Sequence, residues 1–471
     1  MNFFDRLNEW LRNSLIVKLV AIGILILLLL IPANMVESLI REREYNSERV
    51  INEVSSAWSY PQQLVGPMLS VPYTVYFTDE EGKTRSQIRT AHFLPNTLNI
   101  DGELDPQTRY RSIYEVVVYS SQIEVSGSFE HPDFDDFKID SSDVLWDEAV
   151  MEVGISDMRG IQNTVKLSWN DAEYTFSPGV QYPLNNARSS NYNSPSNQYT
   201  YKEAETTTSS NNANASGMSV RLDLTKAKNA YDFSFELDLN GSRNIYFTPL
   251  GETTTTNLTS TWSTPSFQGA FLPDEREVAD SGFSANWEVL SLNRNYPQQW
   301  LNNQYSFGGS RFGVELLIPA DHYQKSMRSA KYSILFIALT FLIFFFVEAL
   351  NGKRIHPIQY ILVGLALILF YTLLLAMSEY IGFTAAYWVA TALIIGLVSL
   401  YIRSIFKNDR LTLVTTAILI ILYGFIYTLL QLEDYALLLG SIGLFVILGF
   451  VMLFTRKIDW YQLNRKEEKI N

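Results

Sequence analysis

Long apolar stretches stand at the two ends of this chain, and a mostly polar stretch of about 290 residues lies between them. About 20 helical residues, each rising about 1.5 Å, cross the roughly 30 Å hydrocarbon core of a bilayer, where only a helix satisfies its own backbone. The pattern therefore predicts six transmembrane helices, over Leu19–Val36, Tyr332–Leu350, Ile358–Ser378, Thr384–Ile402, Leu411–Leu430 and Leu437–Thr455.

Basic residues occur in alternate connections between these stretches, and the turns that begin at Glu379 and Gln431 contain none. Cytoplasmic loops retain Lys and Arg, so the alternation predicts that the N-terminus (1–18) and the tail (457–471) are cytoplasmic. Residues 37–330 are then periplasmic. The basic residues that carry this prediction are Arg6, Arg12, Lys18, Lys353, Arg354, Arg403, Lys407, Arg410, Arg456, Lys457, Arg465, Lys466 and Lys469.

The first apolar stretch, 19–36, is open to two interpretations. It lies near the N-terminus behind positive charge, as in a secretory signal, but Met35 and Glu37 make a poor cleavage site. We therefore expect an uncleaved anchor. Its apolar stripe continues past the membrane, which predicts a helical stalk over 37–60 that Pro61 ends.

After Pro61 the apolar positions recur every second residue and are rich in Val, Ile, Thr, Tyr and Phe. This pattern predicts a mainly-β domain over 61–330, built as one or two antiparallel sandwiches. Gly66, Pro67 and Pro72 are typical of a turn that leads into the first strand. There is no cysteine, so the domain must be stabilised by its own core, for which Trp58, Trp262 and Trp287 are candidates.

One segment of the domain, 185–217, is dominated by Asn, Ser and Thr and has no apolar stripe. Such a composition buries too little surface to order itself, so we expect a long mobile loop. A glycan-decorated or substrate-grasping loop is the alternative.

The charge of the chain is −13, and it is unevenly distributed. From Glu37 to Lys325 there are 39 acidic and 21 basic side chains, whereas basic residues are in excess elsewhere. An acidic external domain excludes nucleic acid as a partner, because phosphates require a basic surface. The lipid bilayer and an envelope protein or glycan are the partners that we expect.

Catalytic and metal-binding motifs are absent, and we predict a protein without a cofactor that is not an enzyme. Near His131, the residues Asp133, Asp135, Asp136 and Asp140 could surround a calcium ion, but the loop lacks the Gly and Glu of an EF-hand. A solvated acidic hairpin is the simpler interpretation. Asp274 and Glu275 could act as an acid–base pair, although a surface turn explains them equally well.

Ionisable residues lie only at the edges of the predicted spans. Glu348 is at the inner end of one span, within reach of Lys353 and Arg354, and Glu379 is at the outer end of the next. Charges deep in a bilayer usually mark a transport path, so their absence favours a packed five-helix bundle over 331–456 that serves as a platform. Hydroxyl groups remain within the spans, on Thr340, Tyr371, Thr391, Ser399, Thr415 and Tyr423.

Several long blocks closely resemble the CreD family of inner-membrane proteins. They include ERVINEVSSAWSYPQQLVGPMLSVPY from Glu48, AHFLPNTLNIDGEL from Ala91, VGISDMRGI from Val153 and STWSTPSFQGAFLP from Ser260. The resemblance spans nearly the whole chain. Two positions depart from it, since the family pattern has Gly where Ser112 stands and His where Tyr380 stands.

The resemblance implies a role in cell-envelope integrity, linked to a two-component regulatory system and to envelope or β-lactam stress. It supplies no catalytic residues. We predict two candidate surfaces for a ligand or partner. One is a groove along Trp262, Pro265, Phe267, Gly269 and Phe271; because such residues usually pack in β domains, a purely structural role is the competing explanation.

The second candidate is a polar cleft lined by Arg109, Arg111, Glu115, Asp157 and Arg159. Such a cleft would suit an enzyme or carrier for a lipid or cell-wall intermediate. A transporter is a further alternative, and it requires a continuous polar path among the spans.

Overall fold

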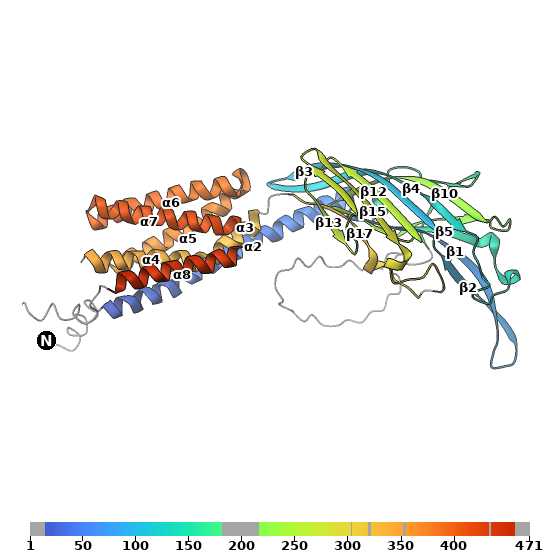
Figure 1. Cartoon of the computed structure of the whole chain (residues 1–471), viewed down its shortest axis with the longest axis horizontal. Helices are drawn as coiled ribbons and strands as arrows, with labels where there is room; N and C mark the ends of the chain where they lie inside the picture. Colours follow the sequence, from blue (N-terminus) through green and yellow to red (C-terminus); the bar gives the residue numbers. More distant parts are fainter. Residues whose placement is uncertain are drawn as a thin grey trace, which may run out of the picture. The chain divides into compact units, whose positions relative to one another are not determined.

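The structure is a computed structural model that describes residues 15–180, 216–302, 304–318, 322–351, 355–432 and 435–456. By their internal contacts the residues divide into two units, Met1–Glu48 with Ala320–Asn471, and Arg49–Pro319. The predicted fold class is confirmed, since one unit is built of apolar helices and the other of two β-sheets (Figure 1). The predicted mobile loop 185–217 lies outside the described residues except for its last two positions, as do Lys353, Arg354 and the tail 457–471.

Seven helices occur within the described residues: α2 (Leu15–Trp58), α3 (His322–Lys331), α4 (Ser333–Asn351), α5 (Pro357–Ile381), α6 (Phe383–Phe406), α7 (Asp409–Gln431) and α8 (Ala436–Thr455). Five of them are long and apolar enough to cross a membrane. Helices α3 and α4 form a pair bent by 44° that makes a sixth candidate span. The six match the six predicted spans in order.

Helix α2 packs along the bundle through one stripe of its surface. Ile22, Leu29, Val36 and Ile40 are buried in the same core as residues of α4 to α7. A side chain at Gly364 of α5 would collide with Leu29, so this glycine permits a close approach of the two helices.

Charged contacts join α2 to the bundle near both ends of its apolar stretch. Lys18 Nζ lies 2.7 Å from Glu348 Oε1, and Arg43 Nε lies 4.0 Å from Glu379 Oε1. Glu348 therefore pairs with Lys18, whereas the sequence suggested Lys353 and Arg354, which lie outside the described residues. Lys18 and Glu348 are 330 positions apart in sequence, and only the packing of α2 beside α4 brings Lys18 to the carboxylate.

The β domain contains two sheets. Within the described residues, the first has the order β13-β17-β11-β1-β5-β9-β8, with β2 beside β1 and β16 beside β2. Its strands are β1 (Gln62–Thr78), β2 (Thr84–Phe93), β5 (Ala149–Ile155), β8 (Ser177–Pro178), β9 (Gly217–Leu222), β11 (Asn244–Thr248), β13 (Pro265–Gly269), β16 (Gln299–Leu301) and β17 (Phe312–Leu316).

The second sheet has the order β14-β15-β12-β3-β4-β10-β6-β7. Its strands are β3 (Thr97–Arg111), β4 (Tyr114–Glu130), β6 (Lys166–Trp169), β7 (Ala172–Thr175), β10 (Ala230–Ser242), β12 (Thr253–Ser260), β14 (Glu275–Ala279) and β15 (Gly282–Leu290). Most pairs are antiparallel, but β1 runs parallel to β11 and β12 parallel to β3.

A single hydrophobic core lies between the two sheets, with residues from both. Trp287 of β15 is fully buried there, and its ring lies 5.5 Å from that of Phe312 on β17 and 5.8 Å from that of Phe267 on β13. Trp287 is thus a core residue, as predicted, and it contacts residues of both sheets. Trp58 and Trp262 are only partly buried.

The prediction of a turn at Gly66, Pro67 and Pro72 is wrong, because all three lie inside β1. Strand β1 pairs with β11, β5 and β2 in succession, and its register with β5 shifts between Val65 and Met68. Proline lacks a backbone donor and is accommodated in strands at such irregularities. The pairing of three neighbours therefore overrides the local preference for a turn.

Candidate functional site

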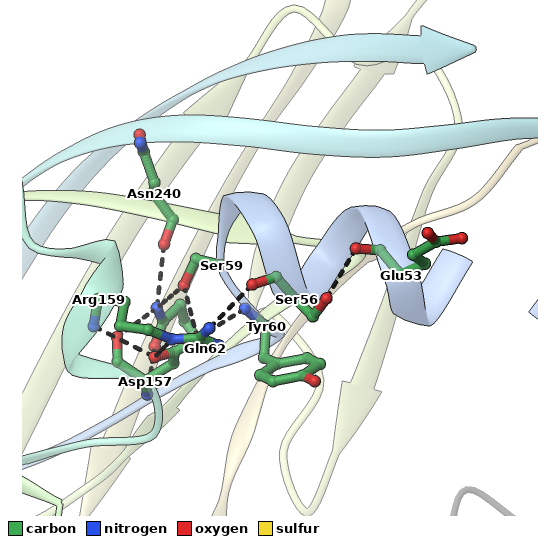
Figure 2. Close-up of polar contacts among 8 residues, drawn as sticks. All are labelled: Glu53, Ser56, Ser59, Tyr60, Gln62, Asp157, Arg159 and Asn240. Carbon is green, nitrogen blue, oxygen red and sulfur yellow. Dashed lines mark hydrogen bonds and ion pairs between the residues drawn. The ribbon is translucent and has the colours of Figure 1, made fainter. Parts of the chain in front are cut away.

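Helix α2 ends within the β domain, where Ser59, Tyr60 and Pro61 lead from Trp58 directly into β1. Ser55 and Ser59 are buried, and the indole Nε1 of Trp58 donates to the carbonyl of Tyr119 on β4 at 3.3 Å. The end of the predicted stalk is therefore part of the domain's own packing. We call residues Glu53–Gln62 with Asp157, Arg159 and Asn240 the helix junction (Figure 2).

Asp157 is the centre of the helix junction. It follows β5 and begins a short 3-10 turn, Met158–Gly160, and its side chain is 10% exposed. Its Oδ2 accepts from Ser59 Oγ at 3.2 Å and from the Tyr60 N–H at 3.0 Å. These donors come from the residues that directly follow α2, so Asp157 fixes the point at which the helix becomes a strand.

Arg159 binds both Asp157 and the helix. Its Nε and Nη2 lie 2.9 and 2.8 Å from the two Asp157 oxygens, while Nη1 donates to the Ser56 carbonyl at 2.8 Å. That carbonyl belongs to the last turn of α2, where oxygens lack helical partners and a cation is favoured. The guanidinium also lies over the Tyr60 ring at 5.1 Å. Arg159 therefore caps the C-terminus of the helix.

The electrostatics of this pair favour the charged forms. Burial raises the pKa of Asp157, but hydrogen bonds from Arg159 and from the Tyr60 N–H outweigh it and lower the pKa to about 2. The hydrogen bond to Asp157, together with its charge, raises the pKa of Arg159. Asp157 is thus ionised at neutral pH.

Gln62 connects the helix junction to the second sheet. Its Nε2 lies 2.9 Å from Ser59 Oγ, 3.0 Å from the Asp157 carbonyl and 2.9 Å from the Asn240 carbonyl on β10. A side chain at Gly160 would collide with the Asn240 carbonyl and the Gln62 side chain. Only glycine therefore allows the backbone at position 160 to pack against these two residues. Two blocks that carry the family resemblance, from Glu48 and from Val153, therefore meet here.

The β3–β4 hairpin contacts the same helical segment from another direction. Arg109 lies over the Trp58 ring at 5.3 Å, and Arg111 Nη2 lies 2.6 Å from Glu53 Oε1. Glu115 is exposed on β4, opposite Tyr110. Ser112 in the turn of this hairpin has a φ of 58°, a left-handed conformation in which glycine is favoured. The glycine that the resemblance implies at this position would adopt that conformation without strain.

Four of the five residues of the predicted cleft therefore lie around one helix end. Arg109, Arg111, Asp157 and Arg159 all contact residues between Glu53 and Tyr60. Their polar groups hold the helix in the domain, which is a structural task. That they also bind a ligand stays a prediction.

The second candidate surface lies at β13, which forms an edge of the first sheet and pairs with β17. The ring of Phe267 lies 5.6 Å from that of Phe283, and the ring of Phe271 lies 6.2 Å from that of Phe312. Both phenylalanines therefore pack against the core.

The remaining residues of this surface bind backbone or form the strand. Trp262 Nε1 donates to the Leu317 carbonyl at 2.9 Å, and Pro265 pairs with Leu316. Gly269 has a φ of 113°, and a side chain there would collide with Arg311. The packing explanation accounts for these contacts, and ligand binding at this edge stays a prediction.

One polar cluster was missed from the sequence. Ser70 of β1 lies between His92 of β2 and Glu152 of β5, with its Oγ 2.9 Å from His92 Nδ1 and 2.7 Å from Glu152 Oε2. All three are at most 2% exposed. Serine is in the middle here, whereas in a catalytic relay the histidine connects the nucleophile and the acid. Strand register alone brings them together, so no sequence signal could have found them.

The acidic residues weighed for calcium and for acid–base chemistry bind backbone N–H groups or begin a strand. Asp133 Oδ1 accepts from the Asp135 N–H, and Asp140 Oδ1 from the Ser142 N–H. Asp274 Oδ2 accepts from the Glu288 N–H, while Glu275 begins β14. In the part of the chain that the structure describes, no three His, Asp or Glu residues come together as a metal site.

Comparison with known proteins decides the family. The family model described as Inner membrane protein CreD matches residues 14–461. The chain belongs to the CreD family. It is 32% identical to the Inner membrane protein CreD of Escherichia coli (strain K12) over 469 residues, which cover 98% of this chain and 96% of that protein. This member of the CreD family is thus an inner-membrane protein, and the helix junction lies within the matched residues.

Proposed function

We propose that this CreD-family protein helps to maintain the bacterial cell envelope under stress, without catalysis, through contacts made by its β domain. In this proposal the β domain is periplasmic and both termini are cytoplasmic. The partner is an envelope protein or a glycan.

The observation that carries the proposal is the helix junction. Asp157 is bound by Ser59, Tyr60 and Arg159, and Arg159 is bound in turn to the Ser56 carbonyl. Charged groups that would serve substrate chemistry in an enzyme are here engaged in attaching a helix to a β-sandwich. Such an attachment suits a protein whose task is to hold a binding domain at the membrane.

A complementation experiment distinguishes this role from that of an enzyme. In cells that lack their own copy, full-length Glu115→Ala and Arg109→Lys variants, the second of which keeps a cation for the contact with Trp58, should restore resistance to dye entry under β-lactam stress. Neither change touches the contacts of Asp157. Loss of function in either variant, at unchanged protein level and thermal stability, would favour the enzyme and overturn the proposal.

The orientation requires its own test. Reporter fusions after Gly82, in the β1–β2 turn, should behave as periplasmic, and fusions after Lys407, between α6 and α7, as cytoplasmic. The opposite pattern would remove the basis for an envelope contact by the β domain.

The partner can be sought from the β13 edge. A photo-crosslinking residue at Ser266 or Gln268, in full-length protein in living cells, should capture one reproducible envelope protein or glycan. A probe at Glu173 on β7, an edge strand of the other sheet, is the matched control. Equal capture from both positions would show that β13 has no partner of its own.

A further inference from the structure

The centre of the helical bundle contains hydroxyl groups from three different helices. Thr340 of α4, Tyr371 of α5 and Tyr423 of α7 are 0%, 2% and 1% exposed. Their hydroxyl oxygens have no hydrogen-bond partner among the residues that the structure describes. Groups of this kind are ordinarily paired in protein interiors, so each requires an explanation.

The two tyrosines are close neighbours. The ring of Phe336 lies 5.8 Å from that of Tyr371 and 4.8 Å from that of Tyr423. The ring of Phe370 lies 5.1 and 5.2 Å from the same two rings. Thr340 is one helical turn after Phe336 on α4, which places the third hydroxyl in the same part of the bundle.

Other hydroxyls in the bundle find partners within the protein. Tyr387 donates to the Tyr423 carbonyl at 2.8 Å, and Ser399 and Thr416 lie 2.7 Å apart and join α6 to α7. Thr415 donates to the Leu411 carbonyl one turn back, as threonine commonly does in helices. Thr391 of α6 and Ser326 and Ser329 of α3 also lack a partner among the described residues, but Thr340, Tyr371 and Tyr423 are the ones gathered around Phe336.

We propose that Thr340, Tyr371 and Tyr423 form an internal water-binding site at the centre of the bundle. Hydrocarbon offers no hydrogen bonds, so an unpaired hydroxyl there is unfavourable unless a buried molecule pairs with it. The aromatic neighbours Phe336 and Phe370 carry no charge, which suits an uncharged ligand. Water is small, both donates and accepts, and binds where several polar groups converge.

The test is the sign of a stability change. Tyr371→Phe and Tyr423→Phe keep the ring and remove only the hydroxyl. If the hydroxyls bind water, each variant in lipid nanodiscs should melt roughly 2 to 4 °C below the unaltered protein. If the interior is dry, removing an unpaired hydroxyl leaves the melting temperature unchanged or raises it, and either result overturns the proposal.

Tyr387→Phe is the matched control, because its hydroxyl donates directly to the Tyr423 carbonyl and its loss should lower the melting temperature in either case. The double variant of Tyr371 and Tyr423 should lose less than the sum of the two single losses, since either change already disturbs the shared water.

Hydroxyl-radical footprinting supplies a second measurement that does not depend on variants. Bound water beside a ring exposes it to radicals, so the peptides that contain Tyr371 and Tyr423 should be oxidised although both rings are buried. Oxidation no greater than that of the peptide with buried Phe406 would contradict the site. The water site concerns the bundle alone and does not depend on the proposed envelope function.

Discussion

Lys18 donates a hydrogen bond of 2.7 Å to Glu348, which also accepts one from the Tyr360 hydroxyl at 3.2 Å. Glu348 is 4% exposed, so these two contacts replace most of the hydration of its carboxyl group. The pair joins the start of α2 to the end of α4 across 330 positions of sequence. Together with Arg43 and Glu379, it binds α2 to the bundle near both ends of the apolar stretch.

Removing one partner of the Lys18–Glu348 pair should destabilise the bundle. We expect Lys18→Met to cost about 1 to 3 kcal/mol, because it leaves a buried carboxylate without its cation, and Lys18 is itself partly exposed. The double variant that combines Lys18→Met with Glu348→Gln should lose less than the sum of the single changes. Thermal melting of the full chain in nanodiscs measures both.

The exposed pair Arg403–Asp409 is the control, with side chains 65% and 78% exposed. Its removal should change stability by less than about 1 kcal/mol. A Lys18→Met variant as stable as the Arg403 variant would show that the Glu348 contact contributes nothing.

Asp157→Asn should weaken the helix junction, because the amide loses the charge that Arg159 and the Tyr60 N–H stabilise. We expect the free energy of unfolding to fall by about 2 kcal/mol at neutral pH. Thermal unfolding of the full-length protein, monitored by its intrinsic tryptophan fluorescence, measures this loss. Asp171→Asn is the control, since its carboxylate is almost fully exposed.

The contribution of Asp157 should also depend on pH. Its pKa is lowered to about 2 in the folded protein, so the stabilisation is complete above the unfolded pKa of about 4. It should disappear as the pH falls from about 4 toward 2. The difference in melting temperature between the unaltered protein and Asp157→Asn should shrink over that interval; a constant difference would mean that the charge is not involved.

Ser112→Gly should stabilise the β3–β4 hairpin, because Ser112 occupies a left-handed conformation with a φ of 58°. The relief of strain exceeds the entropy that glycine loses on folding, and we expect a gain of about 0.5 to 1 kcal/mol. Ser284→Gly, at an exposed position within β15, should instead lower the stability by a similar amount. A loss at both positions would show that Ser112 is not strained.

Gly364→Val should loosen the contact between α2 and α5, because a side chain there collides with Leu29 and approaches Phe341 to 3.1 Å. Overpacking of this kind costs about 1 to 3 kcal/mol. Gly396→Val on α6 is the control, since no atom lies within 4 Å of its added Cβ. Equal melting temperatures for the two variants in nanodiscs would refute the close contact.

The positions of the membrane helices, and the strands in which buried and exposed residues alternate, could be predicted from the amino-acid sequence. Hydropathy is a property of each residue that adds along a segment, so α4 to α8 begin and end within a few residues of the predicted spans. Period-two alternation likewise predicted β4 and β10, because buried and exposed positions alternate along most of each strand.

The contacts of the candidate site could not be predicted from the sequence in the same way. Asp157 was nominated as a cleft residue, but only the folded chain shows that it binds Ser59 and Tyr60, almost 100 positions away. Gly66 and Pro67 lie in a strand because three neighbouring strands pair with β1. Contacts between distant residues depend on strand order and helix packing, which arise from the whole fold and leave no local pattern in the chain.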